Sequence, residues 1–211
     1  AGLQPTTEGS VTFYPKQGDP VDTTHMNAGA IDKLGIRLAF VPEDRLGMGL
    51  VGSMDITENM MLRTYREGHS FLTDKRGPRK LAERIVQQLE VVTSGVSSPV
   101  RRMSGGNVQK VLVGREIASA PSVLMVAYPV RGLDINSSYT IYHLLNEQKV
   151  KGSAVICVGE DLDVLLALCD RIMVLCAGKV TGIVDARTAT KEEIGVLMTH
   201  TEGVIEEGEA G

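Results

Sequence analysis

The residues Ser104, Gly105, Gly106 and Asn107 stand where a helical pattern of apolar residues begins. Adjacent glycines are poor helix formers, and each costs about 1 kcal/mol relative to alanine in a helix interior. They are useful where backbone N–H groups must approach an anion, because the first turn of a helix has free N–H donors and the positive end of the helix dipole. The pattern therefore predicts a phosphate-binding helix start, and an ordinary helix cap is the alternative explanation of the same residues.

Strands and helices alternate on both sides of this turn. Short continuous apolar runs predict strands buried on both faces, and spacings of three and four predict helices. Two further strands meet at a turn-forming dipeptide and predict a hairpin. The alternation indicates the α/β class, with a mainly parallel sheet and right-handed crossovers. The expected strands are 122–127, 154–158, 171–176 and 180–184, and the expected helices are 104–119, about 137–150 and 162–168.

The chain changes character between these elements and its start. Short strands are expected at 11–14 and 36–41, whereas the next stretch has a capping box at 55–58 and a helical apolar spacing over 79–92. We therefore expect the following organisation: an α/β core made of residues 1–43 and 104–200, an inserted helical subdomain at 44–103, and an acidic, solvated tail at 201–211.

Composition excludes several classes of function. The 211 residues have a net charge of −4, 4% aromatic residues and no tryptophan, which argues against a protein that binds nucleic acid. No apolar stretch approaches the roughly 18 residues that a membrane span needs. The cysteines and histidines have no ligand spacing, so no metal site is expected. The chain lacks an initiator methionine and a secretory signal, and we expect it to be a piece of a longer polypeptide.

The sequence resembles the ATP-binding subunits of ABC transporters. Their Leu-Ser-Gly-Gly-Gln signature is similar to Met103–Asn107, and their Gly-Leu-Asp loop is similar to 131–134, directly after an apolar strand. Matches to the switch loop at 158–163 and to the Asp-Arg-Ile strand and hairpin at 169–180 follow in the family's order. The resemblance runs from Gly2 to about Met198. Within the family, 40–50 and 128–134 resemble the second half of tandem ATPases from sugar and nucleoside importers.

Departures from the family pattern concern the chain's own ATP site. No Gly-x-x-x-x-Gly-Lys-Ser/Thr phosphate loop is present, and in the family that loop lies upstream of a segment like the one at the start of this chain. Ala127 and Tyr128 stand where the family has the Asp and Glu that hold Mg²⁺ and polarise the attacking water. Glu160 replaces the switch-loop His, and Glu43 replaces a Gln. The resemblance thus implies an incomplete P-loop NTPase-like core that lacks catalytic residues.

The signature itself is intact. In the family, ATP lies between the phosphate loop of one half and the signature of the other, so the resemblance implies that Ser104, Gly105, Gly106 and Asn107 bind nucleotide in a partner's site. Glu43 is a candidate loop residue, and Asp134 is a candidate interface residue or a plain helix N-cap. The implied cofactors, ATP and Mg²⁺, would act through the complete complex.

The resemblance further implies the cell context and the partners. The chain would be an energy-coupling fragment of a bacterial importer for sugars or nucleosides, peripheral to the cytoplasmic face of the membrane. Its partners would be a second ATPase half and a transmembrane permease that contacts residues 44–103. The alternatives are a non-hydrolytic nucleotide-binding or dimerisation module and a soluble ABC-type ATPase of another class. The short 44–103 insert and the negative net charge disfavour the soluble ATPase.

Overall fold

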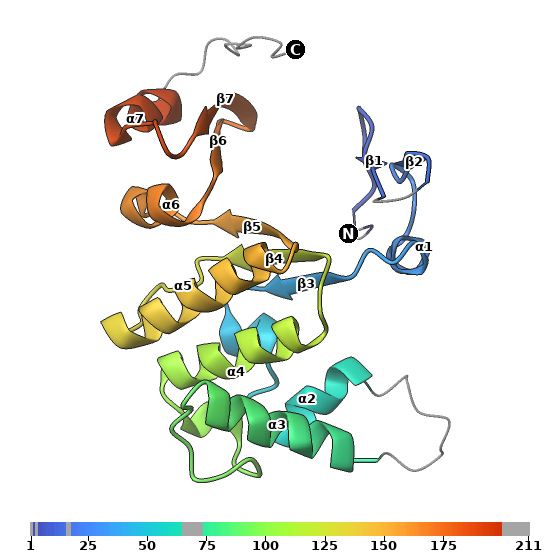
Figure 1. Cartoon of the computed structure of the whole chain (residues 1–211), viewed down its shortest axis with the longest axis vertical. Helices are drawn as coiled ribbons and strands as arrows, with labels where there is room; N and C mark the ends of the chain where they lie inside the picture. The colour runs from blue at the N-terminus through green and yellow to red at the C-terminus, as the bar shows by residue number, and fades with distance from the viewer. Residues whose placement is uncertain (1, 3, 16–17, 65–73, 200–211) are drawn as a thin grey trace. The chain divides into compact units, whose positions relative to one another are not determined.

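A computed structural model of the chain describes residues 2, 4–15, 18–64 and 74–199 (Figure 1). The chain separates into two compact units, residues 1–156 and residues 157–211. The predicted acidic tail at 201–211 lies outside the described residues.

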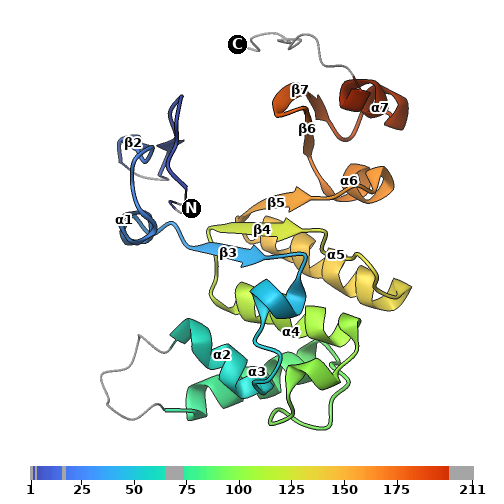
Figure 2. The same ribbon diagram turned by 180° about the vertical axis from the view of Figure 1, so that it is seen from behind.

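The first unit contains a sheet in the order β3 (Leu38–Val41), β4 (Val123–Ala127) and β5 (Ala154–Val158). The pairing of β3 with β4 is parallel, as the strand–helix alternation predicted. Alternate residues of these two strands are buried and share one face of the sheet. Figures 1 and 2 both show α4 (Gly105–Ala118) and α5 (Ile135–Val150) on the same side of this sheet.

The prediction that β4 and β5 are buried on both faces is wrong. Only alternate residues of β4 are buried, and along β5 exposed residues alternate with half-buried ones. Phe40 of β3 and Ile156 of β5 are both exposed. Among the described residues of the first unit the helices cover one face of the sheet, so the apolar side chains of the other face stay accessible.

The helices α2 (Ile56–Thr64) and α3 (Arg76–Gln88) come from the predicted helical stretch, and the subdomain limits 44–103 stay a prediction. The capping box is confirmed, because the Glu58 amide donates to Asp55 Oδ1 at 2.7 Å and the Asp55 amide donates to Glu58 Oε2 at 3.3 Å. The helix predicted at 79–92 corresponds to α3, which begins at Arg76 and ends at Gln88, three and four residues earlier than predicted. Glu90 has φ 49°, a left-handed conformation that stops the helix shortly after Gln88.

Shorter elements complete the first unit. The sequence pattern indicated a strand near β1 but missed its partner strand, the first helix and both short helical turns. The Asn27 side chain caps that first helix by accepting from the Ala30 amide at 2.9 Å. These elements are β1 (Thr12–Phe13), antiparallel β2 (Val21–Asp22), α1 (Ala28–Lys33), a π-helical turn η1 (Arg45–Gly49) and a 3₁₀ turn η2 (Val100–Arg102).

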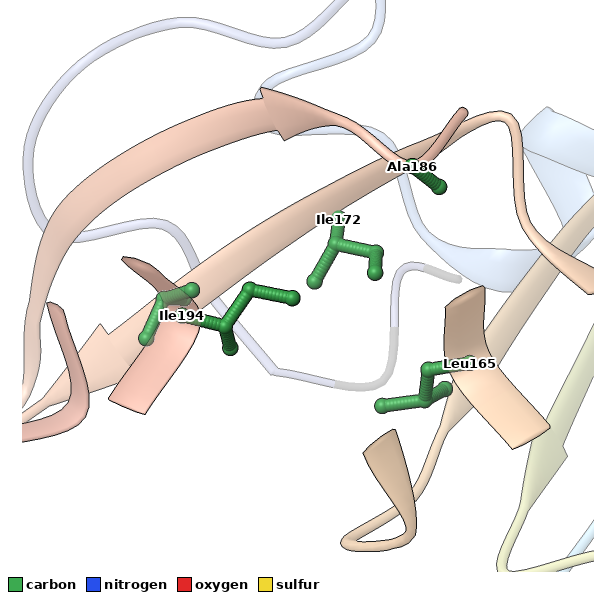
Figure 3. Packing of buried hydrophobic residues seen from close by; sticks show 5 residues of the cluster. Leu165, Ile172, Ala186 and Ile194 are labelled. Atoms are coloured by element: carbon green, nitrogen blue, oxygen red, sulfur yellow. The ribbon is translucent and has the colours of Figure 1, made fainter. Parts of the chain in front are cut away.

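The second unit consists of α6 (Leu162–Leu168), the antiparallel hairpin of β6 (Arg171–Cys176) and β7 (Lys179–Asp185), and α7 (Lys191–Thr199). The predicted hairpin is confirmed, and Ala177 and Gly178 both have the positive φ that a tight two-residue turn needs. Its core joins residues from both helices and the hairpin. Figure 3 shows the buried side chains of Leu165, Ile172, Ala186 and Ile194.

Gly114 offers a test of the packing between α4 and α3. A Cβ at this position would meet Ile85 Cγ2 at 2.9 Å and Leu89 Cδ1 at 3.1 Å. Crowding of this kind costs about 1–3 kcal/mol, and the helix propensity of alanine returns about 1 kcal/mol. We therefore expect Gly114→Ala to lower the free energy of unfolding by up to about 2 kcal/mol, measured by urea denaturation.

The matched control is Gly77→Ala in α3, where an added Cβ has no atom within 4 Å. This variant should be neutral or should stabilise the chain by up to about 1 kcal/mol. Equal effects of the two substitutions would contradict the close α3–α4 contact.

Candidate functional site

The start of α4 has the geometry of an anion-binding helix terminus. Ser104 is the N-cap residue with extended backbone, and its side chain makes no capping hydrogen bond. The first hydrogen bond back to the cap runs from the Val108 amide to the Ser104 carbonyl at 2.9 Å. The amides of Gly105, Gly106 and Asn107 precede it and have no acceptor within the helix. Ser104 and Gly105 are exposed, Asn107 is half-buried and Gly106 is buried, so the helix start reaches the surface at its first residues, at the positive end of the helix dipole.

The Asn107 side chain is hydrogen-bonded within the chain, and its role toward a nucleotide stays a prediction. Its Oδ1 accepts from the Val92 amide at 2.9 Å, and its Nδ2 donates to Ser104 Oγ at 2.9 Å. Because that hydrogen bond uses an acceptor site of the Ser104 hydroxyl, the O–H group remains able to donate elsewhere. The Asn107 side chain thus holds Ser104 in position.

The two glycines differ in their surroundings. Gly105 is exposed, whereas Gly106 is buried against the start of α5. A Cβ on Gly106 would come within 2.5 Å of Ser137 Oγ and within 3.2 Å of Asp134 Oδ2. Gly106 therefore lets the starts of α4 and α5 approach each other, in addition to any role toward a ligand.

Asp134 is the N-cap of α5. Its Oδ1 accepts from the Ser137 amide at 2.9 Å, and its Oδ2 accepts from the Ser137 hydroxyl at 2.7 Å. These two hydrogen bonds stabilise the carboxylate and lower the pKa of Asp134 below its ordinary value. The N-cap reading of Asp134 is confirmed, and its role at an interface stays a prediction.

Two of the positions discussed above, Tyr128 and Glu43, both contact Arg131. Ala127 ends β4, and Tyr128 follows it with φ 48°. The Arg131 guanidinium lies 5.6 Å from the centre of the Tyr128 ring, and its Nη1 donates to Glu43 Oε1 at 2.5 Å. Both charged side chains are largely exposed, so the ion pair contributes little stability. Glu160 belongs to the second unit, between β5 and α6.

Arg45 and Gln109 are central to the site, and the sequence analysis missed both. Arg45 Nε donates to Gln109 Oε1 at 2.8 Å, and Arg45 Nη2 donates to the Arg131 carbonyl. Gln109 is 1% exposed, and its Nε2 donates to the Pro129 carbonyl at 2.8 Å. A signal for Gln109 existed, because it is a polar residue beside apolar Val108 in the predicted helix 104–119. No local pattern marks Arg45.

A buried ionic cluster on the same helix holds the 44–50 segment. Glu116 is fully buried and forms ion pairs with Arg115 and Arg63, and its Oε2 also accepts from the Phe40 amide at 3.4 Å. Arg115 Nη2 donates to the Gly49 carbonyl at 2.7 Å. Burial lowers the pKa of Arg115, and the charge of Glu116 opposes that shift. The cluster connects α2, β3 and η1 to the last turn of α4.

Neither a metal cluster nor a membrane helix is found in the part of the chain that the structure describes. Within residues 4–15, 18–64 and 74–199, no three His, Cys, Asp or Glu side chains are grouped so that they could hold a metal ion. Over the same residues, no helix combines the length and apolarity needed to cross a bilayer.

The fold is that of ABC ATPase cassettes. A dimeric ATP-binding cassette in a post-hydrolysis state with ADP and Pi superposes with a TM-score of 0.69 at 23% identity, covering 88% of this chain and 76% of that one. A nucleotide-free cassette from an ABC transporter gives a TM-score of 0.67 at 21% identity, covering 99% of this chain and 80% of that one. No protein-family model matches the chain.

The relatives in sequence are ATP-binding proteins of sugar importers. The chain is 37% identical to a xylose import protein of Moorella thermoacetica, over 80% of this chain and 33% of the relative. It is 37% identical to a ribose import protein of Streptomyces coelicolor, over 87% and 35%. A galactose/methyl galactoside import protein of Shigella boydii is 31% identical, over 92% and 37%. The chain thus spans about a third of the length of these relatives.

The capping carboxylate at the start of α5 gives a pH-dependent prediction. Because the pKa of Asp134 is lowered by folding, its stabilising effect is complete above the unfolded pKa of about 3.9 and is lost as the pH falls through the lower folded value. Asp134→Ala should lower the urea midpoint at pH 7, and the difference from the native chain should shrink below about pH 4.

The variant Asp134→Asn is the control for this experiment. Asparagine also caps helices but carries no charge, so the difference between the Ala and Asn variants should not change with pH. A gap between the native chain and Asp134→Ala that stays constant down to pH 2.5 would rule out the carboxylate as its source.

Proposed function

We propose that this chain is part of the ATP-binding, energy-coupling subunit of an importer for sugars or nucleosides. In this proposal the start of α4 binds the phosphates of a nucleotide held mainly by a partner ATPase half. The single observation that carries it is the exposed, uncapped start of α4, found in a fold shared with ATP-binding cassettes. The similarity to xylose, ribose and galactose import proteins supports the class of transporter.

The chemistry of the α4 start suits a terminal phosphate. Backbone amides of Gly105 and Gly106 supply donors whose direction is fixed by the helix, and the helix dipole favours negative charge at this end. The Ser104 hydroxyl adds a donor whose orientation is set by the bond from Asn107. These groups bind an anion without lowering the barrier to hydrolysis themselves, so the attacking water and the metal belong to the partner's half of the site.

The chain's own ATP site is proposed to be catalytically inactive. In ATP hydrolysis Mg²⁺ neutralises charge on the phosphates, and a carboxylate orients the water. Ala127 has no metal-binding group, and the phenol of Tyr128 is a poor substitute for a carboxylate. The Glu43 carboxylate forms an ion pair with Arg131. ATP and Mg²⁺ would therefore reach this chain through the competent site of the complete protein.

The proposed membrane partner is a permease that contacts the segment around η1. Apolar side chains are exposed on and beside this turn, with Met48 at 74% and Leu46 and Val51 also exposed. The buried cluster of Arg115 and Glu116 connects the same segment to α4. A movement of η1 against a permease could thereby be transmitted to the nucleotide site. The chain would then act at the cytoplasmic face of the membrane, as a peripheral subunit.

A second candidate function is a nucleotide-binding or dimerisation module without turnover. It is favoured by Ala127 and Tyr128, because a half that needs no catalysis of its own can lose these carboxylates. This candidate differs from the first in one measurable respect. Under the second candidate, substitutions in residues 104–107 would leave the ATPase activity of the complete protein unchanged.

The test of the proposed function is Ser104→Arg in the complete ATP-binding protein. A long cationic side chain at the α4 start would block the approach of a phosphate carried by the partner half. We expect ATPase activity to fall by about 100-fold or more, comparable with the loss of an oriented donor in other enzymes. Steady-state ATPase assays with purified protein measure the effect.

The matched control is Asn146→Arg, which adds the same side chain to an exposed position of α5. It should leave activity unchanged. Unchanged activity in Ser104→Arg would show that this signature takes no part in the working site and would favour the second candidate.

A further inference from the structure

Three segments far apart in sequence are joined through a single side chain. Arg45 belongs to η1, and it reaches both the α4 helix and the loop that connects β4 to α5. Its Nε contacts Gln109 on the first turns of α4, and its Nη2 contacts the carbonyl of Arg131 in the loop. Among the described residues, Arg45 is the side chain whose hydrogen bonds link these three segments directly.

Gln109 extends the link into the interior. Its Oε1 accepts from Arg45 at 2.8 Å, and its Nε2 donates to the Pro129 carbonyl at 2.8 Å, so both ends of the buried amide are used. A buried amide that loses a partner costs more than the hydrogen bond was worth, because its polar group is left desolvated. The loop between β4 and α5 is therefore anchored at two carbonyls, those of Pro129 and Arg131.

The anchored loop carries Asp134 to the start of α4. The start of α5 packs so closely against position 106 that a Cβ there would lie 2.5 Å from Ser137 Oγ. The Asp134 carboxylate and the signature amides consequently belong to one surface. Their relative position is fixed on one side by the Gly106 contact and on the other by Arg45 and Gln109.

We propose that Arg45 and Gln109 are positioning residues, which hold the α4 start and the 128–134 loop as one preformed surface for the partner's nucleotide. This inference rests on the proposed function, because it assumes that the α4 start binds phosphate. Preorganised donors bind an anion without reordering, and loosening them weakens binding before it affects the chemical step.

A direct contact between Arg45 and phosphate is the competing explanation. Arg45 Nη1 lies 3.5 Å from the position that a Cβ on Gly105 would occupy, so the charge is close to the helix start. Lysine separates the two explanations, because it keeps the positive charge but lacks the planar fork that reaches two acceptors at once. Under the positioning account Arg45→Lys fails to restore function, whereas a simple charge contact would be largely restored.

The experiment compares Arg45→Met, Arg45→Lys, Gln109→Leu and the double variant Arg45→Met/Gln109→Leu in the complete ATP-binding protein, with ATP as the probe. We expect each single variant to raise KM for ATP by about tenfold, the effect of a lost hydrogen bond to a charged group, with kcat changed by less than about threefold. The double variant should show about the same tenfold increase and not a hundredfold one, because both side chains act through one link.

The control is Arg79→Met, which removes an exposed arginine from α3 and should leave KM and kcat unchanged. A purely structural role would instead lower the melting temperature and reduce kcat with the fraction of folded protein, while KM stayed the same. If Arg45→Lys has the native KM, a direct charge contact with phosphate, and not positioning, explains the role of Arg45. If Ser104→Arg is inactive while the Arg45 and Gln109 variants have native KM, the positioning proposal fails and the proposed function stands.

Discussion

Free backbone amides at the start of a buried helix are the feature on which the account of this chain depends. The first amides of α4 have no acceptor within the helix. The Ser104 side chain accepts a hydrogen bond from Asn107 and does not cap these amides. Donors that point in a fixed direction at the positive end of a helix dipole are well suited to a phosphate. The rest of the first unit can be understood as the structure that places these donors and keeps them in place.

Three buried polar residues lie among the apolar residues that pack α4 against its neighbours. Gln109, Arg115 and Glu116 are buried along α4, and each forms hydrogen bonds or ion pairs with residues outside its own turn. Buried polar groups require exact partners, so such contacts specify one arrangement of loops more strongly than apolar packing does. Outside this buried set, Glu43 and Tyr128 both contact Arg131 at the surface.

The sequence predicted most of the parallel sheet, the α4 start and the hairpin, because these depend on local periodicity and on turn-forming residues. The exposed face of β5 was mispredicted, since an apolar run does not reveal which of its faces a neighbour covers. Asn107 was assigned to a ligand, yet its side chain bonds to Val92 and Ser104. Arg45 could not be found from the pattern, because its partners lie 64 and 86 positions away. Gln109 could have been found as a polar residue on a buried face.

The most direct measurement is a structure of the complete ATP-binding protein with its partner half and a non-hydrolysable ATP analogue. The account predicts that the terminal phosphate lies about 3 Å from Ser104 Oγ and from the amide of Gly106, with Asp134 on the same surface. It also predicts no nucleotide-bound metal at Ala127. A nucleotide bound between the halves with the start of α4 turned away from its phosphates would contradict the account.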